Sequence, residues 1–234
     1  ALIARRFAAD GSVLGDSLVT GTTSKVIRFP SISMNSAAAY VVSWREQQGT
    51  SFGFERIFAQ AYAAGGQPLG RVEVATDTSL ERPDRSSIAG DVAIDNDGDF
   101  TVAWREEKTG APIPVPIGYA ALSLQTSAIK ARRYSSDGTP IGTLATLATS
   151  LTDPGLGLPT GRNAPPAVAT DAAGDSVVVW ASTDGLGMSG VFGRRLGSQG
   201  RANGLKFRID GNGNPFGTGD YAPAIAMSDD GAFV

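Results

Sequence analysis

The sequence predicts an all-β protein made of tandem repeats, and three observations support that prediction. The first is a pair of glycines four positions apart, which occurs four times along the chain. The second is a tryptophan that follows a β-branched residue by twelve positions, three times over. The third is the composition, because the 234 residues include 30 glycines and 13 prolines, which suits many tight turns and not a helical protein.

Each glycine pair marks the turn of a predicted β-hairpin. An alternating run such as Lys130–Tyr134 leads into a short polar turn, here Ser136-Asp137-Gly138. Glycine accepts a positive φ at little steric cost, so Asp-Gly between alternating runs is a strong hairpin signal. The second glycine is expected to open the returning strand, at a bulge or a close approach. The pairs are Gly11 and Gly15, Gly66 and Gly70, Gly138 and Gly142, and Gly200 and Gly204.

The recurring tryptophans mark a second hairpin in each repeat. The returning strand of this hairpin ends in the tryptophan, and in Val177–Trp180 it is apolar on both faces. Such a strand is expected to be covered on both sides. A fourth copy begins at Ile225, and its tryptophan would fall beyond the last residue printed. The three complete pairs are Ile32 with Trp44, Val92 with Trp104, and Val168 with Trp180.

Two hairpins give four strands per repeat, and repeats of about 55 to 72 residues fit the blades of a β-propeller. In such a fold each blade covers the apolar face of its neighbour, with the tryptophan wedged between them. A solenoid of stacked hairpins stays open as an alternative. We expect one domain over residues 1–234, as a piece of a larger array whose blade number stays open. Its approximate repeats are 1–55, 56–127, 128–189 and 190–234, the last incomplete.

Taken together as one motif, the glycine-pair hairpin and the tryptophan hairpin resemble the propeller-like repeats that form long tandem arrays in large secreted or surface-attached bacterial proteins. Those proteins often also contain RTX calcium-binding or cadherin-like modules. The resemblance implies a scaffold or adhesive module at a bacterial cell surface, and it supplies no catalytic residues. The chain departs from the motif at Ala61, where other copies have arginine. The residues that match are Arg133, Tyr134, Gly138, Gly142, Pro166, Val168, Ala169, Gly174 and Trp180.

The composition disfavours several classes of function. The chain has no cysteine and no histidine, which removes disulfides, thiolate metal sites and the usual general base. A net charge of −3 argues against a nucleic-acid binder, and no apolar run is long enough to cross a bilayer. A glycoside hydrolase or lyase needs only carboxylates and stays open. Its candidates would be Glu46, Glu106 and Glu107, although their recurrence after the tryptophans favours a structural role.

One acidic turn suggests a metal site. Asp95, Asp97 and Asp99 alternate along the turn, and Glu106 stands at the twelfth position, where an EF-hand loop has its bidentate ligand. The turn glycine, Gly98, is misplaced for an EF-hand. Aspartate and glycine are also the residues that stabilise an ordinary hydrogen-bonded turn, and this second interpretation is favoured. Calcium is the one cofactor that the sequence suggests.

Arginine pairs and two insertions are the other candidate contact sites. The arginines could form a ring that attracts anions, or pack their stems over aromatic rings with the charge paired, which is favoured. The insertions Lys108–Ser127 and Asp153–Pro166 could contact a partner or shield a sheet edge. The prolines of the first are not expected within a central strand. The arginine pairs are Arg5 and Arg6, Arg132 and Arg133, and Arg194 and Arg195.

The sequence therefore predicts a non-enzymatic, extracellular structural or adhesive module. A carbohydrate-binding propeller is the alternative, and a carboxylate-dependent glycoside hydrolase or lyase is a third. The expected partners are proteins or glycans at a surface, or further copies of the repeat. Nucleic acid and membrane insertion are not expected.

Overall fold

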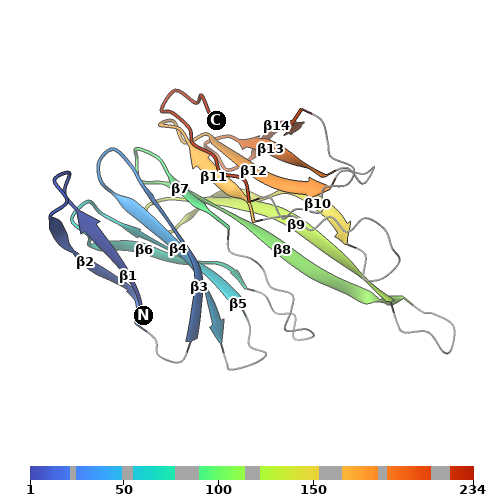
Figure 1. Ribbon diagram of the computed structural model, residues 1–234, viewed down its shortest axis with the longest axis horizontal. Coiled ribbons are helices and arrows are strands. Elements are labelled where there is room, and N and C mark those ends of the chain that lie inside the picture. Colours follow the sequence, from blue (N-terminus) through green and yellow to red (C-terminus); the bar gives the residue numbers. More distant parts are fainter. Residues whose placement is uncertain are drawn as a thin grey trace.

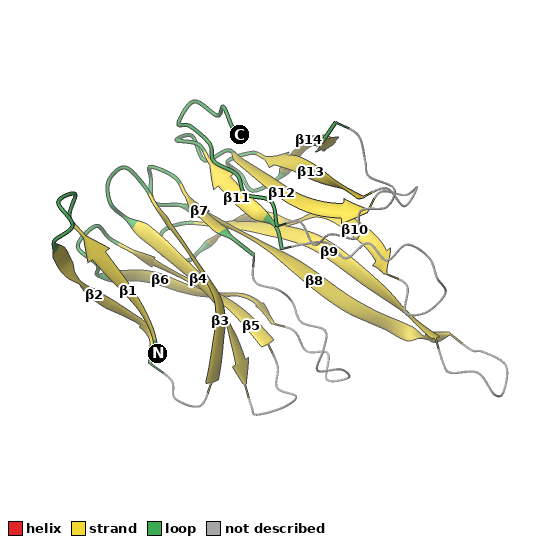
Figure 2. Cartoon of the chain, viewed as in Figure 1, coloured by secondary structure: helices red, strands yellow, loops and turns green. Residues whose placement is uncertain are grey.

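The computed structural model describes residues 1–21, 25–48, 55–76, 90–113, 122–152, 165–183, 189–211 and 222–234. Every regular element in these residues is a β-strand (Figure 2), so none is a helix of the length and apolarity that crossing a bilayer requires. The strands are β1 (Leu2–Phe7), β2 (Val13–Thr20), β3 (Lys25–Met34), β4 (Tyr40–Gln48), β5 (Glu55–Tyr62), β6 (Pro68–Thr76), β7 (Val92–Ile94), β8 (Phe100–Ile113), β9 (Leu122–Tyr134), β10 (Pro140–Thr152), β11 (Ala167–Thr170), β12 (Ser176–Thr183), β13 (Ser189–Leu196) and β14 (Ala202–Arg208).

The strands form three antiparallel sheets of four strands each. The first sheet is β3–β6, the second β7–β10 and the third β11–β14, and in each sheet consecutive strands are neighbours. Strands β1 and β2 form a separate hairpin, and residues 222–234 contain one isolated bridge, between Met227 and Phe233. The hairpin, the sheets and the last segment follow one another in chain order (Figure 1). The all-β prediction, with four-stranded antiparallel units, is confirmed.

The sheets are shifted in phase against the sequence repeats. Each sheet joins the tryptophan hairpin of one repeat to the glycine-pair hairpin of the next. The first sheet spans residues 25–76, across the repeat boundary at 55, and the other two sheets cross their boundaries in the same way. The hairpin β1–β2 therefore corresponds to a third and fourth strand, and residues 222–234 correspond to a first strand and the start of a second.

The glycine pairs occupy the turns that the sequence predicts. The first glycine of each pair has a positive φ, +85° at Gly11 and Gly66, +87° at Gly138 and +69° at Gly200. The second glycine lies at an irregularity of the ladder in the second sheet, where the pairing shifts between Ile141 and Ala145. A side chain at the first position would force a strained backbone, which is why the motif keeps glycine there.

The second strand of each sheet sends alternate side chains into two different seams. Trp44 lies in a cluster with residues of the hairpin β1–β2, whereas its neighbour on the opposite face, Val41, packs toward the second sheet. Trp104 faces the first sheet and Trp180 faces the second. All three indoles are buried, each against the unit that precedes it in the chain. The tryptophans thus occupy equivalent places, as the repeat predicts.

Stacked aromatic pairs close the same seams at one end of the sheets. The rings of Tyr40 and Tyr62 stack with centroids 4.7 Å apart in the first sheet, and those of Phe100 and Tyr134 lie 5.4 Å apart in the second. Burial raises the pKa of Tyr62 to about 12, and burial likewise raises the pKa of Tyr134 to about 12. The third sheet pairs Ser176 with Leu196 at this position.

The second glycine of one sheet receives the turn of the next sheet. The Gly70 amide donates to the carbonyl oxygen of Ser136 at 3.1 Å, and a Cβ on Gly70 would lie 1.9 Å from the carbonyl carbon of Asp137. A Cβ on Gly142 would lie 2.0 Å from the carbonyl oxygen of Gln199. Main chain therefore packs on main chain at equivalent points of two seams.

One expectation about the first insertion is wrong. Pro112 was not expected within a central strand, yet β8 extends to Ile113 and pairs Pro112 with Ser123 of β9. The neighbour on the other side, β7, pairs only with Phe100–Val102 of β8. Among the residues that the structure describes, the far half of β8 therefore pairs only with β9, and a residue without an amide hydrogen is tolerated in a strand that is paired on one side.

Replacing Gly70 with alanine tests the main-chain contact between sheets. Because the new methyl group would overlap the backbone of Asp137, Gly70→Ala should lower the free energy of unfolding by about 1–3 kcal/mol or more. Gly211→Ala is the matched control, since a Cβ there meets nothing within 4 Å, and it should change stability by less than about 0.5 kcal/mol. Urea unfolding followed by tryptophan emission measures both, and equal effects would contradict the packing.

Candidate functional site

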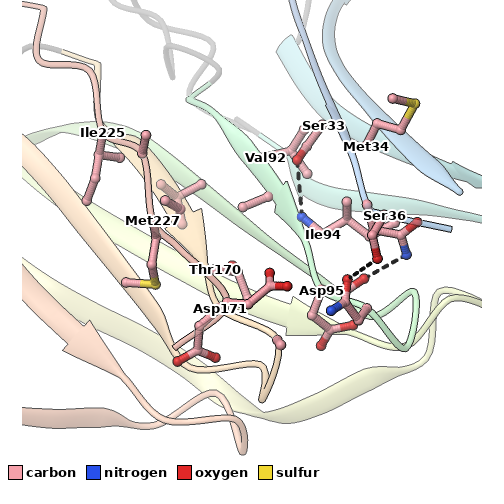
Figure 3. Close-up of a pocket in the computed structure, with 18 of the residues that line it drawn as sticks. Ser33, Met34, Ser36, Val92, Ile94, Asp95, Thr170, Asp171, Ile225 and Met227 are labelled. Atoms are coloured by element: carbon pink, nitrogen blue, oxygen red, sulfur yellow. Dashed lines mark hydrogen bonds between the residues drawn. The ribbon is translucent and has the colours of Figure 1, made fainter. Parts of the chain in front are cut away.

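The first strands of the units line one pocket of about 360 Å³. Figure 3 shows how β3, β7, β11 and the last segment approach it from successive repeats. The residues at its wall occupy equivalent positions in the repeat, so the pocket follows the pseudo-symmetry of the chain. They are residues 32–36, 91–96 and 168–172, with Ile225, Ala226, Met227 and Asp229.

Hydrogen bonds between neighbouring first strands hold the wall of the pocket together. The carboxylate of Asp91 accepts from the Ser31 hydroxyl at 2.5 Å and from the Val168 amide at 3.2 Å. One side chain of the second sheet thereby joins the first and the third. The Ile94 amide donates to the Ser33 hydroxyl at 3.4 Å, a contact drawn in Figure 3. These polar groups are engaged within the scaffold.

The turns at one end of the first strands share a single design. The side-chain oxygen of Asn35 accepts the amides of Ala37 and Ala39 at 3.1 and 3.0 Å. Asp95 accepts the amides of Asp97 and Asp99 at 2.9 and 3.0 Å in the same way. Asp171 repeats the pattern in the third sheet. The aspartates thus form Asx turns, the interpretation that the sequence favoured.

A buried ion pair ties the turn of the second sheet to the third sheet. The guanidinium of Arg133 contacts the second carboxylate oxygen of Asp95 and lies 3.5 Å from Asp99. Its other terminal nitrogen donates to the carbonyl oxygen of Gly174 at 3.1 Å. Arg133 and Asp95 are both almost fully buried, so the pair is shielded from water. The positive charge that this acidic turn binds is therefore the guanidinium group of Arg133.

These contacts do not fit a calcium site at Asp95, Asp97 and Asp99. Both oxygens of Asp95 are used by amides and by Arg133, and Asp97 is exposed. Burial raises the pKa of Asp99, an effect that Arg133 opposes and the charge of Asp95 reinforces. Within the described ranges no three acidic side chains are grouped to hold a metal. Calcium binding stays a prediction that this geometry does not support.

The arginine pairs pack and pair as the favoured interpretation expects. Arg5 forms an exposed ion pair with Asp16, 2.8 Å apart. Arg195 lies over the ring of Phe233, 5.0 Å from its centroid. Arg194 donates to the carbonyl oxygen of Leu147 in the preceding sheet at 3.2 Å. The guanidinium groups of these arginines are therefore engaged in contacts within the chain.

The two described glutamates that follow the tryptophans, Glu46 and Glu106, also have structural partners. The carboxylate of Glu46 is buried and accepts from the indole of Trp44 at 3.0 Å and from Arg71 at 3.3 Å. Glu106 pairs with Lys130 at 2.5 Å. The side chain of Glu107 lies outside the described part of the chain. Neither described glutamate faces a second carboxylate across the pocket, whose wall includes neither of them.

The structure also places residues that sequence reasoning missed. Asp91 has alanine or serine at the equivalent positions of the other repeats, so no repeated signal pointed to it. The partner of Arg133 was not predicted, although both residues were singled out separately. The tips of the two insertions, residues 114–121 and 153–164, lie outside the described residues, and the expectation of partner contacts there stays a prediction.

Comparison with known proteins adds no family to these observations. Neither a scan against protein-family models nor a search of curated proteins finds a match to the chain.

Removing one member of the buried ion pair should be costly. Arg133→Met would leave the carboxylate of Asp95 buried beside apolar groups, which should lower the free energy of unfolding by about 3–5 kcal/mol. Asn35 shows that an amide makes the same turn, so adding Asp95→Asn should recover about 1–2 kcal/mol. Denaturant unfolding measures all the variants.

The matched control for this pair is the exposed one. Arg5→Met removes an ion pair at the surface and should change stability by less than about 1 kcal/mol. A double variant no more stable than Arg133→Met alone would contradict the role given to the Asp95 charge.

Proposed function

We propose that the chain is a non-enzymatic structural or adhesive module in which the four-stranded sheets are blades of a β-propeller, and that it acts at the surface of a bacterial cell. The observation that supports this most directly is the repetition of one seam. The same indole contact joins each sheet to the unit before it, and the first strands of successive repeats line one pocket.

The arrangement of the first strands supports the propeller in this proposal. In a propeller the first strand of every blade lies next to the central axis and the later strands lie progressively outward. Here β3, β7 and β11 adjoin one pocket, while each sheet continues away from it as a meander. A solenoid would stack its repeats without gathering equivalent strands around one hollow. The pocket is thus part of the axial channel in this proposal.

The absence of enzymatic activity is proposed because the repeated polar residues already have structural partners. Asp95 forms an ion pair with Arg133, and Glu46 accepts a hydrogen bond from the indole of Trp44. A retaining or inverting glycosidase needs two carboxyl groups that face a substrate across a cleft. The carboxylates of Asp95 and Glu46 are instead engaged by Arg133 and Trp44 within the scaffold. The surface location rests on the resemblance of the repeat to those of large bacterial surface proteins.

A carbohydrate-binding propeller is the second candidate and is less favoured. A lectin would present the same exposed polar and aromatic side chains in every repeat. At the rim of the pocket the equivalent residues are Ser36, Asn96, Ala172 and Asp229, which differ in size, charge and hydrogen-bonding capacity. The repeated tryptophans and the tyrosines Tyr62 and Tyr134 lie in the seams.

Antibodies against the purified chain test the proposed location and role. Intact cells of the source organism should be labelled as strongly as permeabilised ones, because the module is accessible from outside. Labelling that requires permeabilisation would contradict a surface role.

A glycan array tests the carbohydrate-binding alternative, and the chain should bind none of the immobilised glycans. Retention that is lost on Asp171→Ala would favour the carbohydrate-binding alternative, and hydrolysis of a glycan that is lost on Glu106→Gln would overturn the non-enzymatic assignment.

A further inference from the structure

The outer edge strand of the second sheet, β10, contains no charged residue. It is the last strand of its sheet, and among the described residues it pairs with β9 alone. Charges on an edge strand discourage it from pairing with another chain, and β10 lacks that protection. The equivalent strands all have charges, which are Asp16 in β2, Arg71 and Glu73 in β6, and Lys206 and Arg208 in β14.

The composition of β10 favours pairing with a further strand. From Ile141 to Thr152 it has no proline, and it is made mostly of threonine, leucine and alanine. Threonine is a β-branched residue that suits an extended strand, and uncharged segments of this kind are typical of strands that pair between molecules. The second sheet has the first sheet on one face and the third on the other, so this edge belongs to a complete part of the stack.

The first half of β10 is engaged by the third sheet. A Cβ on Gly142 would lie 2.0 Å from the carbonyl oxygen of Gln199, and the carbonyl oxygen of Leu147 accepts from Arg194 at 3.2 Å. The pairing with β9 also shifts twice in this half, before Ala145 and before Ala148. Such irregularities twist an edge strand and hinder the addition of another.

The second half of β10 has neither feature. From Ala148 to Thr152 it pairs with β9 residue by residue and without a shift. It also continues past the edge of the first sheet, because β6 ends at Thr76, and Thr76 and Ala148 stand equally far after Gly70 and Gly142. Figure 1 shows that β8 and β9 likewise reach beyond the neighbouring sheets. A regular edge in this position is accessible to another molecule.

An uncharged edge is complementary to a second copy of itself. Two antiparallel copies of β6 or β14 would bring arginine or lysine side chains of both copies to one short interface, whereas two copies of β10 bring no charges together. Antiparallel pairing of identical strands has a two-fold axis perpendicular to the sheet. This axis places both copies of any residue on the same face. Thr149, which is exposed, would therefore lie close to its own copy.

We propose that two copies of the chain associate edge to edge through β10. Residues 148–152 of one copy pair antiparallel with the same residues of the other, so that the two second sheets become one continuous sheet. The main-chain amides and carbonyls of both edges supply the hydrogen bonds, as in other cases of strand addition. The contact uses the same patch on both copies, so it closes at two copies. The inference goes beyond the proposed function and requires neither the propeller nor the surface location.

Sedimentation velocity of the purified chain over a range of concentrations tests the proposal. The wild-type chain should form a species of two copies as its concentration rises. Thr149→Lys should weaken this association about tenfold, because the two-fold axis brings two ammonium groups together on one face. Leu69→Lys is the matched control, since Leu69 is 51% exposed on the outer strand of the first sheet, and it should associate like the wild type. Circular dichroism checks that the strand content of each variant is unchanged.

A mixture of two variants tests whether β10 pairs with itself. Thr149→Lys and Thr149→Glu should each associate weakly alone, because each brings like charges together. Mixed in equal amounts they should associate at least as strongly as the wild type, since each pair then has one charge of either sign. A contact between β10 and a different surface would show no such recovery.

Three outcomes would overturn the proposal. A wild-type chain that stays a single copy at every concentration would show that no second copy binds this edge, whatever else covers it. Equal association of Thr149→Lys and the wild type would place the contact elsewhere. A mixture that associates no better than the separate variants would contradict the two-fold pairing. None of these outcomes bears on the labelling of intact cells, so the two proposals fail separately.

Discussion

The burial of one indole per sheet against the preceding unit is the contact on which the fold depends. A four-stranded meander has two faces, and in this chain both faces of the second strand are apolar. No sheet can therefore bury its own apolar surface alone. Trp44, Trp104 and Trp180 each place the largest apolar side chain of their sheet in the seam with the preceding unit, and residues on the opposite face, such as Val41, fill the seam with the following one. The sheets are mutually dependent for this reason, and the order of stacking follows the order of the chain.

The remaining contacts fix the geometry of that stack. Main chain meets main chain at Gly70, where no side chain fits, and this sets how closely the outer turns of neighbouring sheets approach. Near the pocket, Asp91 joins three successive first strands, and Arg133 joins the turn of one sheet to the next. The polar side chains of a type that could act in catalysis or metal binding instead form hydrogen bonds and ion pairs within and between neighbouring sheets.

The sequence predicted the structure correctly at positions where the local conformation or packing is met by one residue type. Positive φ at Gly138 and a buried indole at Trp104 followed from local chemistry, and repetition in register multiplied the signal. It was uninformative where a contact joins residues of different repeats that do not recur. Asp91 has no equivalent, and the pairing of Arg133 with Asp95 requires the sheet register to be known. The expectation for Pro112 was wrong because proline is excluded only from a strand that is paired on both sides. Strand β7 is too short to pair with β8 at Pro112. Whether an acidic turn binds a metal or an arginine was likewise a matter of tertiary contact.

Iodide quenching of tryptophan emission, before and after removal of residues 1–21, measures the central contact most directly. In the intact chain all three indoles should be protected from iodide, because each is sealed by the unit before it. Without the hairpin β1–β2, Trp44 loses its cover, so one indole in three should become accessible while Trp104 and Trp180 stay protected. Equal protection of all three indoles in both chains, with the strand content unchanged by circular dichroism, would contradict the account.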